Sequence, residues 1–203
     1  MPNNKKSFSL QNLNLIIALC AILISVASFY ATYLQANAAH KQVKAMTLPL
    51  LQFEHHNVEK DEHKLVFKLK NAGMGPAVVK KVTFIYNNIE STSLSKYIKT
   101  CCENEVQEYQ QYHKRLAEMI AQGKPLAEAK GFGTNPISNF ILPGQSDYDM
   151  LIFPIDTEYA NFWNALDNAR FYTKVRVCYC SLLDECYISE NAGDYKPVES
   201  CSE

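Results

Sequence analysis

An uncharged run of 20 apolar and small residues near the N-terminus is the first strong pattern in the chain. It covers residues 15–34 and reads LIIALCAILISVASFYATYL. A helix of this length is about 30 Å long, which matches the hydrocarbon core of a bilayer. Tyr30 and Tyr33 lie near one end, as interfacial aromatic residues do. The run predicts an uncleaved transmembrane helix. A signal peptide is the alternative, because Ala36-Asn37-Ala38 resembles a cleavage site.

One face of this predicted helix carries only small or polar side chains. Its members recur at alternating steps of three and four residues, which places them on one side of a helix. They are Gln11, Asn14, Ala18, Ala21, Ser25, Ser28, Thr32, Gln35 and Ala39. In lipid, small residues let helices approach closely, and hydroxyls can bond across the contact. We expect Ala18, Ala21, Ser25, Ser28 and Thr32, named here the small-residue stripe, to form a helix–helix interface in a homo-oligomer. The alternative is that Ala and Ser are simply common in membrane helices.

Short runs of alternating polarity follow, and they predict a mainly-β domain. The predicted organisation is an N-terminal tail over 1–14, a transmembrane helix over 15–34, a juxtamembrane helix or linker over 35–48, a soluble domain over 49–190 and a polar tail over 191–203. Strands are expected at about 50–56, 65–70, 82–86, 137–142, 147–153, 171–180 and 186–189. Because βαβ alternation is absent, the pattern favours a β-sandwich-like domain.

Two helices are expected within this domain. A helical insertion at about 89–135 contains an amphipathic helix over about 103–122, with Gly123 as its stop, and then a looser segment over 124–133. A second, shorter helix over about 157–168 has Asp156 or Thr157 as its cap. Tyr109 on the first helix is expected to pack on the sheet, although Tyr109 and Tyr112, one turn apart, could also form a surface that docks a partner.

Charge and cysteine usage narrow the class of protein. Four of the 20 basic residues and none of the 21 acidic residues lie before residue 45, so the domain has a formal charge of about −5. An acidic domain argues against nonspecific nucleic-acid binding as its main role. Lysines on both flanks of residues 15–34 leave the orientation undecided by the positive-inside rule. The six cysteines outside the helix do not have the spacing of a disulfide framework. We therefore expect reduced thiols and a cytoplasmic domain.

Motifs that carry chemistry are weak in this sequence. Cys178-x-Cys180 and Cys101-Cys102 lack the spacing that lets paired thiolates converge on zinc, so no metal or other cofactor is predicted. Cys180 and Cys186 flank a turn and could approach each other as a redox pair, although packed, reduced cysteines are favoured. No nucleophile elbow, HExxH or phosphate-binding loop is present, so no enzyme is predicted.

Two further patterns have structural and functional interpretations. Asn71–Ala77 has glycines at 73 and 75, but a strand pattern follows it, so a structural turn is favoured over a phosphate-binding loop. Lys64, Lys68, Lys70 and Lys80 could share the outer face of an early hairpin and contact RNA, a nucleotide or lipid headgroups. A solvated strand face is the default interpretation of these lysines.

The order of these segments resembles a group of uncharacterised bacterial single-pass membrane proteins. The resemblance rests on Leu48-Pro49-Leu50-Leu51-Gln52-Phe53, on the N-x-G-x-G-P-A turn at Asn71–Ala77, and on the segment from Tyr179 to Tyr187 that reads YCSLLDECY. It implies a single span followed by a small β domain, and no assigned chemistry. The architecture alone also resembles membrane effectors of antiphage defence systems, including those encoded with retrons.

Two functions are therefore expected from the sequence. The first is a membrane-anchored effector of a bacterial antiviral, abortive-infection system, which senses a partner or ligand through its soluble domain and perturbs the inner membrane. The second is a single-pass adaptor or structural protein that recruits a soluble partner. Membrane lipid, further copies of the chain, and a protein or ribonucleoprotein encoded by a neighbouring gene are the expected partners.

Overall fold

The computed structural model describes residues 10–59, 62–123, 133–190 and 194–201, and divides the chain into two compact units, Met1–Ala45 and Met46–Glu203. In the first unit, helix α1 (Leu10–Thr47) continues into the first residues of the second. It therefore contains the predicted span 15–34 and most of the predicted linker 35–48. Residues 1–9 of the tail expected over 1–14 lie outside the described residues.

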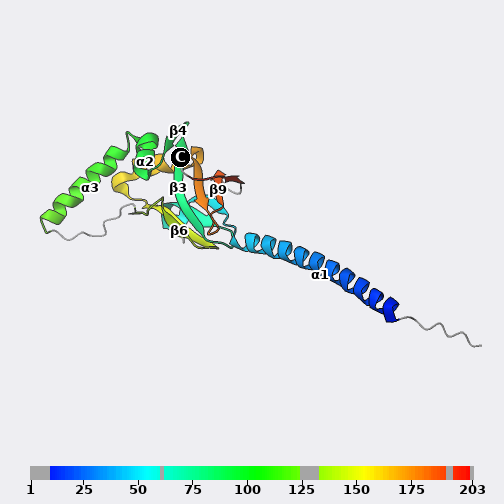
Figure 1. The fold of residues 1–203 in the computed structure, drawn as a ribbon. Helices are drawn as coiled ribbons and strands as arrows, with labels where there is room; N and C mark the ends of the chain where they lie inside the picture. The colour runs from blue at the N-terminus through cyan, green and yellow to red at the C-terminus, as the bar shows by residue number, and fades with distance from the viewer. Residues whose placement is uncertain (1–9, 60–61, 124–132, 191–193, 202–203) are drawn as a thin grey trace, which may run out of the picture. The chain divides into compact units, whose positions relative to one another are not determined.

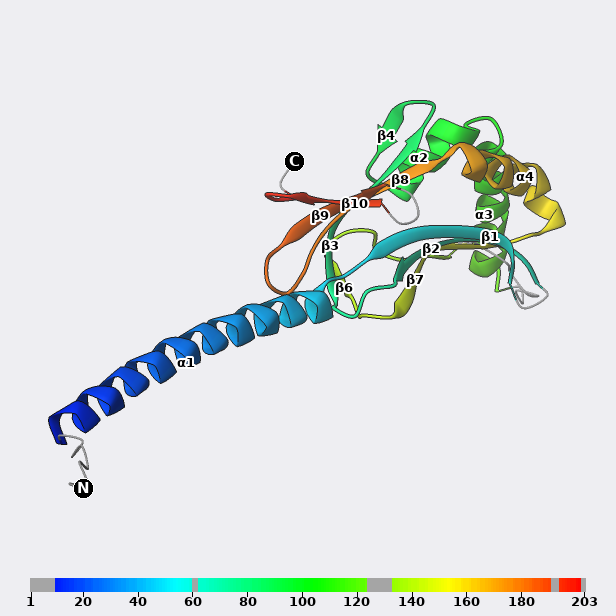
Figure 2. The ribbon, with the colours of Figure 1, turned by 90° about the vertical axis from the view of Figure 1, so that its right-hand side faces the viewer.

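The second unit is built on two antiparallel sheets (Figures 1 and 2). The first sheet has the order β1-β2-β7-β5 and comprises β1 (Leu51–Glu59), β2 (Glu62–Asn71), β7 (Ser146–Pro154) and β5 (Gly133–Thr134). The second has the order β10-β9-β8-β3-β4 and comprises β10 (Asp194–Val198), β9 (Cys186–Glu190), β8 (Lys174–Cys180), β3 (Ala77–Tyr86) and β4 (Ile89–Ser91). Strand β6 (Phe140–Leu142) also pairs with β3. The mainly-β prediction is confirmed.

The inner faces of the two sheets share one hydrophobic core. On β8, Val175, Val177 and Tyr179 are buried, as their alternation in the sequence predicts. Phe67 of the first sheet and Phe84 of the second stack with their ring centroids 6.2 Å apart, so the sheets meet directly at this point.

Helices cover one end of this core (Figure 2). They are α2 (Leu94–Cys102), α3 (Val106–Ala121), η1 (Thr157–Tyr159), α4 (Ala160–Ala169) and η2 (Arg170–Tyr172). The ring centroid of Tyr109 on α3 lies 5.5 Å from that of Phe153 in the first sheet, and the ring centroid of Phe162 on α4 lies 5.2 Å from it. The Trp163 indole N–H donates to the Phe153 carbonyl at 2.9 Å, so the only tryptophan of the chain is held in the core.

Helix α3 confirms the amphipathic helix predicted over about 103–122. The structure adds α2, which precedes that range within the insertion, and residues 103–105 form the turn between the two helices. Ser93 caps α2 by accepting the Lys96 N–H at 3.2 Å, and α2 buries Leu94, Tyr97, Ile98 and Cys102 on one face. The other helix signals are confirmed: α3 ends at Ala121, next to Gly123 at φ +66°, and Asp156 caps η1. Residues 124–132 of the looser segment predicted over 124–133 lie outside the described residues.

Two strand predictions also change. The segment expected as a strand over 171–180 begins with η2, and β8 starts at Lys174. The C-terminal region, expected as a polar tail over 191–203, contains β10, which pairs with β9. Four of the five side chains of β10 are exposed, so this edge strand has no apolar alternation to reveal it.

Candidate functional site

The small-residue stripe lies along α1, and Ala18, Ala21, Ser25, Ser28 and Thr32 are all exposed. Among the described residues, one helix, Asn12–Thr47, is long and apolar enough to cross a membrane, and none of its apolar window is buried. Length and composition alone would also admit a signal sequence so near the N-terminus. The Thr32 hydroxyl donates to the Ser28 carbonyl of its own helix at 2.9 Å, so its proton is satisfied without a neighbouring helix.

A cluster of four cysteines lies on the second sheet of the domain. Cys178 and Cys180 share one face of β8, Cys186 begins β9, and Cys201 follows β10. Disulfides join Cys178 to Cys201 and Cys180 to Cys186, and a third joins Cys101 to Cys102 at the end of α2. The expectation of reduced, unpaired thiols is therefore corrected. We name Cys178, Cys180, Cys186 and Cys201 the cysteine cluster.

Strand pairing brings these four residues together. Cys180 and Cys186 are direct cross-strand partners in the β8–β9 ladder, and their Cα atoms are 4.0 Å apart. Val198 of β10 pairs with Cys186, so the chain returns along the sheet and places Cys201 three residues later beside Cys178. Cys201 falls in the predicted polar tail over 191–203, so the sequence pattern does not place it beside Cys178.

The two disulfides of the cluster are not separate from each other. The Cys180 and Cys201 sulfurs lie 3.9 Å apart, and the sulfurs of Cys180, Cys186 and Cys201 all lie within 4.8 Å of one another. Cys178 and Cys180 are buried, whereas Cys186 and Cys201 are partly exposed. Three sulfurs therefore form one group at the surface of the sheet, and Cys178 is attached to it through its bond to Cys201.

The turn that connects β8 to β9 is well fixed. The Ser181 N–H donates to the Glu185 carbonyl at 2.8 Å, and the Asp184 N–H donates to the Ser181 carbonyl at 3.2 Å. Tyr187 follows on β9, where burial and its hydrogen bond to the Glu185 carboxylate raise the pKa of the phenol to about 12. Cys180 and Cys186 are therefore held in place by the backbone as well as by their bond.

A groove of about 610 Å³ opens beside the cysteine cluster. It is lined by Cys178 and Cys201 together with charged residues, including Lys81 and Arg176. Lys81 is the direct cross-strand partner of Cys178 in the β3–β8 ladder, so the two side chains project from the same face of the sheet. A cation at this position favours the thiolate form of a reduced cysteine.

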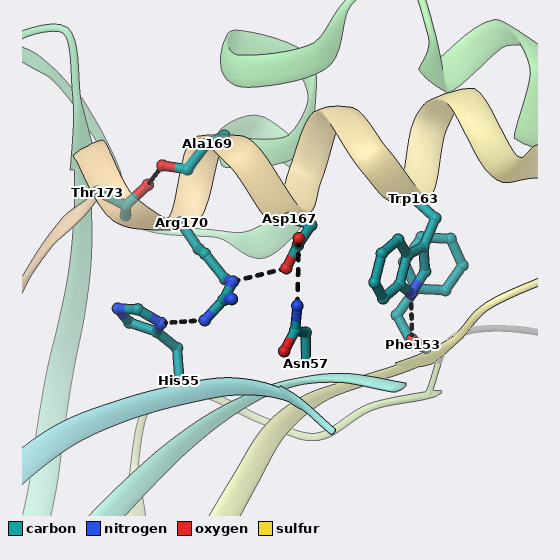
Figure 3. A network of polar contacts seen from close by, with 8 residues as sticks. All are labelled: His55, Asn57, Phe153, Trp163, Asp167, Ala169, Arg170 and Thr173. Carbon is teal, nitrogen blue, oxygen red and sulfur yellow. Dashed lines mark hydrogen bonds and ion pairs between the residues drawn. The ribbon is translucent and has the colours of Figure 1, made fainter. Parts of the chain in front are cut away.

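A polar network fastens β1 to α4 and η2 (Figure 3). The Arg170 guanidinium donates from Nε to Asp167 Oδ1 at 2.7 Å and from Nη1 to His55 Nδ1 at 2.7 Å. Asn57 donates to the other Asp167 oxygen at 3.3 Å. Burial and the nearby Arg170 charge lower the pKa of His55, so its ring is held neutral as an acceptor. Because Arg170 is buried and paired, this network holds the fold together.

The early lysines do not form a basic surface. Lys80 lies on β3, in the other sheet from Lys64, Lys68 and Lys70 on β2. The turn between β2 and β3 connects two sheets, so the hairpin that would align these lysines does not exist. Acidic partners also lie nearby: Lys68 is 3.6 Å from Asp149, and Lys70 is 3.5 Å from Glu54. The alternative of one shared basic face of four lysines for RNA, a nucleotide or lipid headgroups is therefore wrong, because Lys80 lies on the other sheet.

Tyr109 is a core residue, as the simpler interpretation predicts, and Tyr112 is buried beside it. Both are buried, and their rings each lie 5.2 Å from the ring of Tyr159. They are not available to dock a partner.

Comparisons of the chain with known protein families, with curated proteins and with solved structures found no match.

Proposed function

We propose that this protein is a single-pass effector of a bacterial antiviral defence system, anchored in the inner membrane by α1. A cytoplasmic domain is still the proposed orientation, but the disulfides remove the reduced-thiol argument for it, so it rests on the reporter test below. In this proposal the domain senses a partner or ligand, and association of α1 helices then perturbs the membrane. The observation that supports it most is the small-residue stripe, which runs unbroken along a helix whose apolar window has no partner within the described residues.

The stripe is suited to close helix contact. Lipid provides no hydrophobic drive for association, so packing of small side chains and interhelical hydrogen bonds must supply it. Ser25 and Ser28 are the informative members, because the Thr32 proton is already bonded within its own helix. Each interhelical hydroxyl bond is worth roughly 0.6 kcal/mol, and several copies in an oligomer multiply that contribution.

The test replaces both Ser25 and Ser28 with Leu. The longer side chains prevent close approach and remove both hydroxyls, while the higher hydrophobicity keeps the helix in the membrane. The double variant should fractionate with the membrane, form fewer cross-linked oligomers, and lose toxicity or phage protection when the system is triggered. The matched control, Ile16→Val with Leu23→Val, changes side chains outside the stripe and should behave as the unmodified protein.

Full activity and full cross-linking of the Ser25→Leu/Ser28→Leu variant would overturn the role of the stripe. A reporter fused to the C-terminus tests the sidedness separately. A reporter that works only in the cytoplasm should be active at this position. If a periplasm-specific reporter is active at the C-terminus instead, the domain lies on the periplasmic side. A reverse transcriptase, nucleotide cyclase or nuclease gene beside this one would also favour the effector.

An adaptor is the second candidate, and a groove on the domain favours it. The groove measures about 920 Å³ and is lined by residues of β1, β3, η2 and β8, including Arg170, Phe171 and Tyr172. The Phe171 and Tyr172 side chains are 64% and 74% exposed, which is unusual for adjacent aromatic residues outside a contact surface. A photo-cross-linker at Tyr172, compared with one at exposed Leu182, should capture the recruited protein only at Tyr172. Equal capture at both positions would contradict a specific adaptor surface.

A further inference from the structure

The geometry of the cysteine cluster points to a second state of this site. We propose that, in the reduced protein, Cys178, Cys180, Cys186 and Cys201 bind one Zn²⁺ ion as a structural tetrathiolate site, in place of the two disulfides. The inference is independent of the proposed function, because it concerns one face of the second sheet and not α1.

The sulfurs of three of the four cysteines, Cys180, Cys186 and Cys201, already lie at distances that suit such a site. Zinc holds four thiolates at about 2.3 Å in a tetrahedron, so neighbouring sulfurs in a zinc site lie about 3.8 Å apart. The Cys180 and Cys201 sulfurs, which belong to different disulfides, are already 3.9 Å apart. The sulfurs of Cys180, Cys186 and Cys201 all lie within 4.8 Å of one another, and Cys178 is bonded to Cys201, so rotation of the Cys178 side chain after reduction would have to bring the fourth sulfur to the ion. Two independent disulfides would have no reason to place sulfurs of different pairs this close together.

The chain supplies the ligands as a structural site requires. Cys178 and Cys180 come from one strand and Cys186 from the next, while Cys201 closes the set from the segment after β10. Four protein ligands leave no open position, which is the arrangement of a structural zinc site and not of a catalytic one. Bound zinc would therefore attach the C-terminal segment to the sheet.

Lys81 beside the cluster favours thiolates, although Glu90 and Glu199 also line the groove. A zinc tetrathiolate carries a net charge of −2, and Lys81 lies directly opposite Cys178 in the ladder. The groove of about 610 Å³ is lined by Cys178, which is buried, and by Cys201, which is partly exposed, so an ion would reach the site from the Cys201 side. In the balanced reaction, a thiol reductant supplies four electrons and four protons to the two disulfides. Zn²⁺ then displaces the four protons from the resulting thiols.

The disulfides themselves are not essential to the fold in this view. Cys180 and Cys186 are only six residues apart, and the β8–β9 ladder holds them in place without the bond. The domain also has a continuous core that both sheets share, so it does not belong to the small domains that depend on disulfides for stability. The reduced chain is therefore expected to keep its fold and to offer four thiols to a metal ion.

The experiment uses the full chain, purified in detergent with a phosphine reductant and then freed of loosely bound metal. Metal analysis after addition of a small excess of Zn²⁺ should give one zinc per chain. Addition of Co²⁺ instead should give the absorption bands of a tetrahedral cobalt tetrathiolate, which report sulfur ligands directly. The Cys178→Ser/Cys201→Ser variant should lose at least about nine-tenths of the bound zinc, because two ligands are missing.

Two comparisons keep the result interpretable. The Cys101→Ser/Cys102→Ser variant removes the other disulfide pair and should retain one zinc per chain. Fluorescence of Trp163, which lies in the domain core, shows whether each variant is folded. The proposal is overturned if the folded, reduced, unmodified chain binds no zinc. It is also overturned if the cobalt spectrum lacks sulfur ligation, or if loss of Cys101 and Cys102 removes the metal.

Discussion

Asn71 is buried completely and bonds through both ends of its amide, so its replacement should destabilise the domain strongly. Its oxygen accepts the N–H groups of Leu50 at 3.1 Å and Gly73 at 3.0 Å. Its NH₂ group faces three carbonyl oxygens, those of Gly75 at 2.9 Å, Pro143 at 3.0 Å and Leu142 at 3.3 Å. The amide has two hydrogens and two lone pairs, so all four bonding positions are filled.

The magnitude follows from these contacts. Asn71→Ala removes four filled bonding positions, each worth about 1 kcal/mol net, and leaves backbone groups without a partner, so the loss is roughly 4 kcal/mol. For a domain of this size, 1 kcal/mol lowers the melting temperature by about 2–4 °C, so we expect a fall of about 8–16 °C. The control Asn104→Ala changes an exposed turn residue and should shift the midpoint by less than about 2 °C.

Thermal unfolding followed by tryptophan fluorescence is the assay. Trp163 is the only tryptophan, and it lies in the domain, so the full chain can be measured in detergent without a signal from α1. Asn71→Asp sharpens the test because it keeps the shape but turns a second oxygen toward the three carbonyls. Burial there raises the pKa of the new carboxyl group above its unfolded value of about 3.9, so the variant should be least unstable below that pH and lose stability as the pH rises. An Asn71→Ala midpoint within about 2 °C of the unmodified protein would refute this account.

Two further predictions concern close packing and titration. Gly75→Ala should lower the melting temperature by several degrees, because its Cβ would lie 2.0 Å from the Thr47 carbonyl oxygen. Gly133→Ala, which has open space around it, should have little effect. Equal shifts of the melting temperature in the two variants would contradict the steric argument. His55 has a lowered pKa and accepts a bond from Arg170, so it stabilises the fold above its unfolded pKa of about 6.5, and this contribution is lost as the pH falls through the folded value. His55→Gln can accept the same bond without titrating, so its melting temperature should fall less than that of the unmodified protein between pH 7.5 and 5.5; parallel profiles would exclude this role.

The parts of the fold that could be predicted are those with a local pattern. Strand β8 has apolar residues at every second position, and its inward face is buried as expected. Asp156 caps η1 and Gly123 follows α3, because caps and stops depend on neighbouring backbone groups alone. The mainly-β class follows from the same local signals.

The parts that could not be predicted depend on contacts between distant segments. Strand β10 is exposed at four of five positions and exists because β9 offers it a free edge. Helix α2 was missed because it is short, with its apolar face formed by Leu94, Tyr97, Ile98 and Cys102. The cysteine cluster depends on β10, so a sequence pattern alone could not place Cys201 beside Cys178. The small-residue stripe is visible in the sequence, but its association with other helices stays a prediction.

The turn at Asn71–Ala77 shows why a correct local prediction can still lead to a wrong topology. A short turn with two glycines between two strands normally indicates a hairpin, and the lysines of 64–80 were aligned on that basis. Asn71 instead bonds the turn to Leu50 and to the 142–143 segment, so the chain leaves the first sheet and starts β3 in the second. A Cβ on Gly73 would lie 2.4 Å from the Leu48 carbonyl oxygen, and one on Gly75 would overlap Thr47. The glycines are therefore required because the backbone at 47–50 passes against the turn.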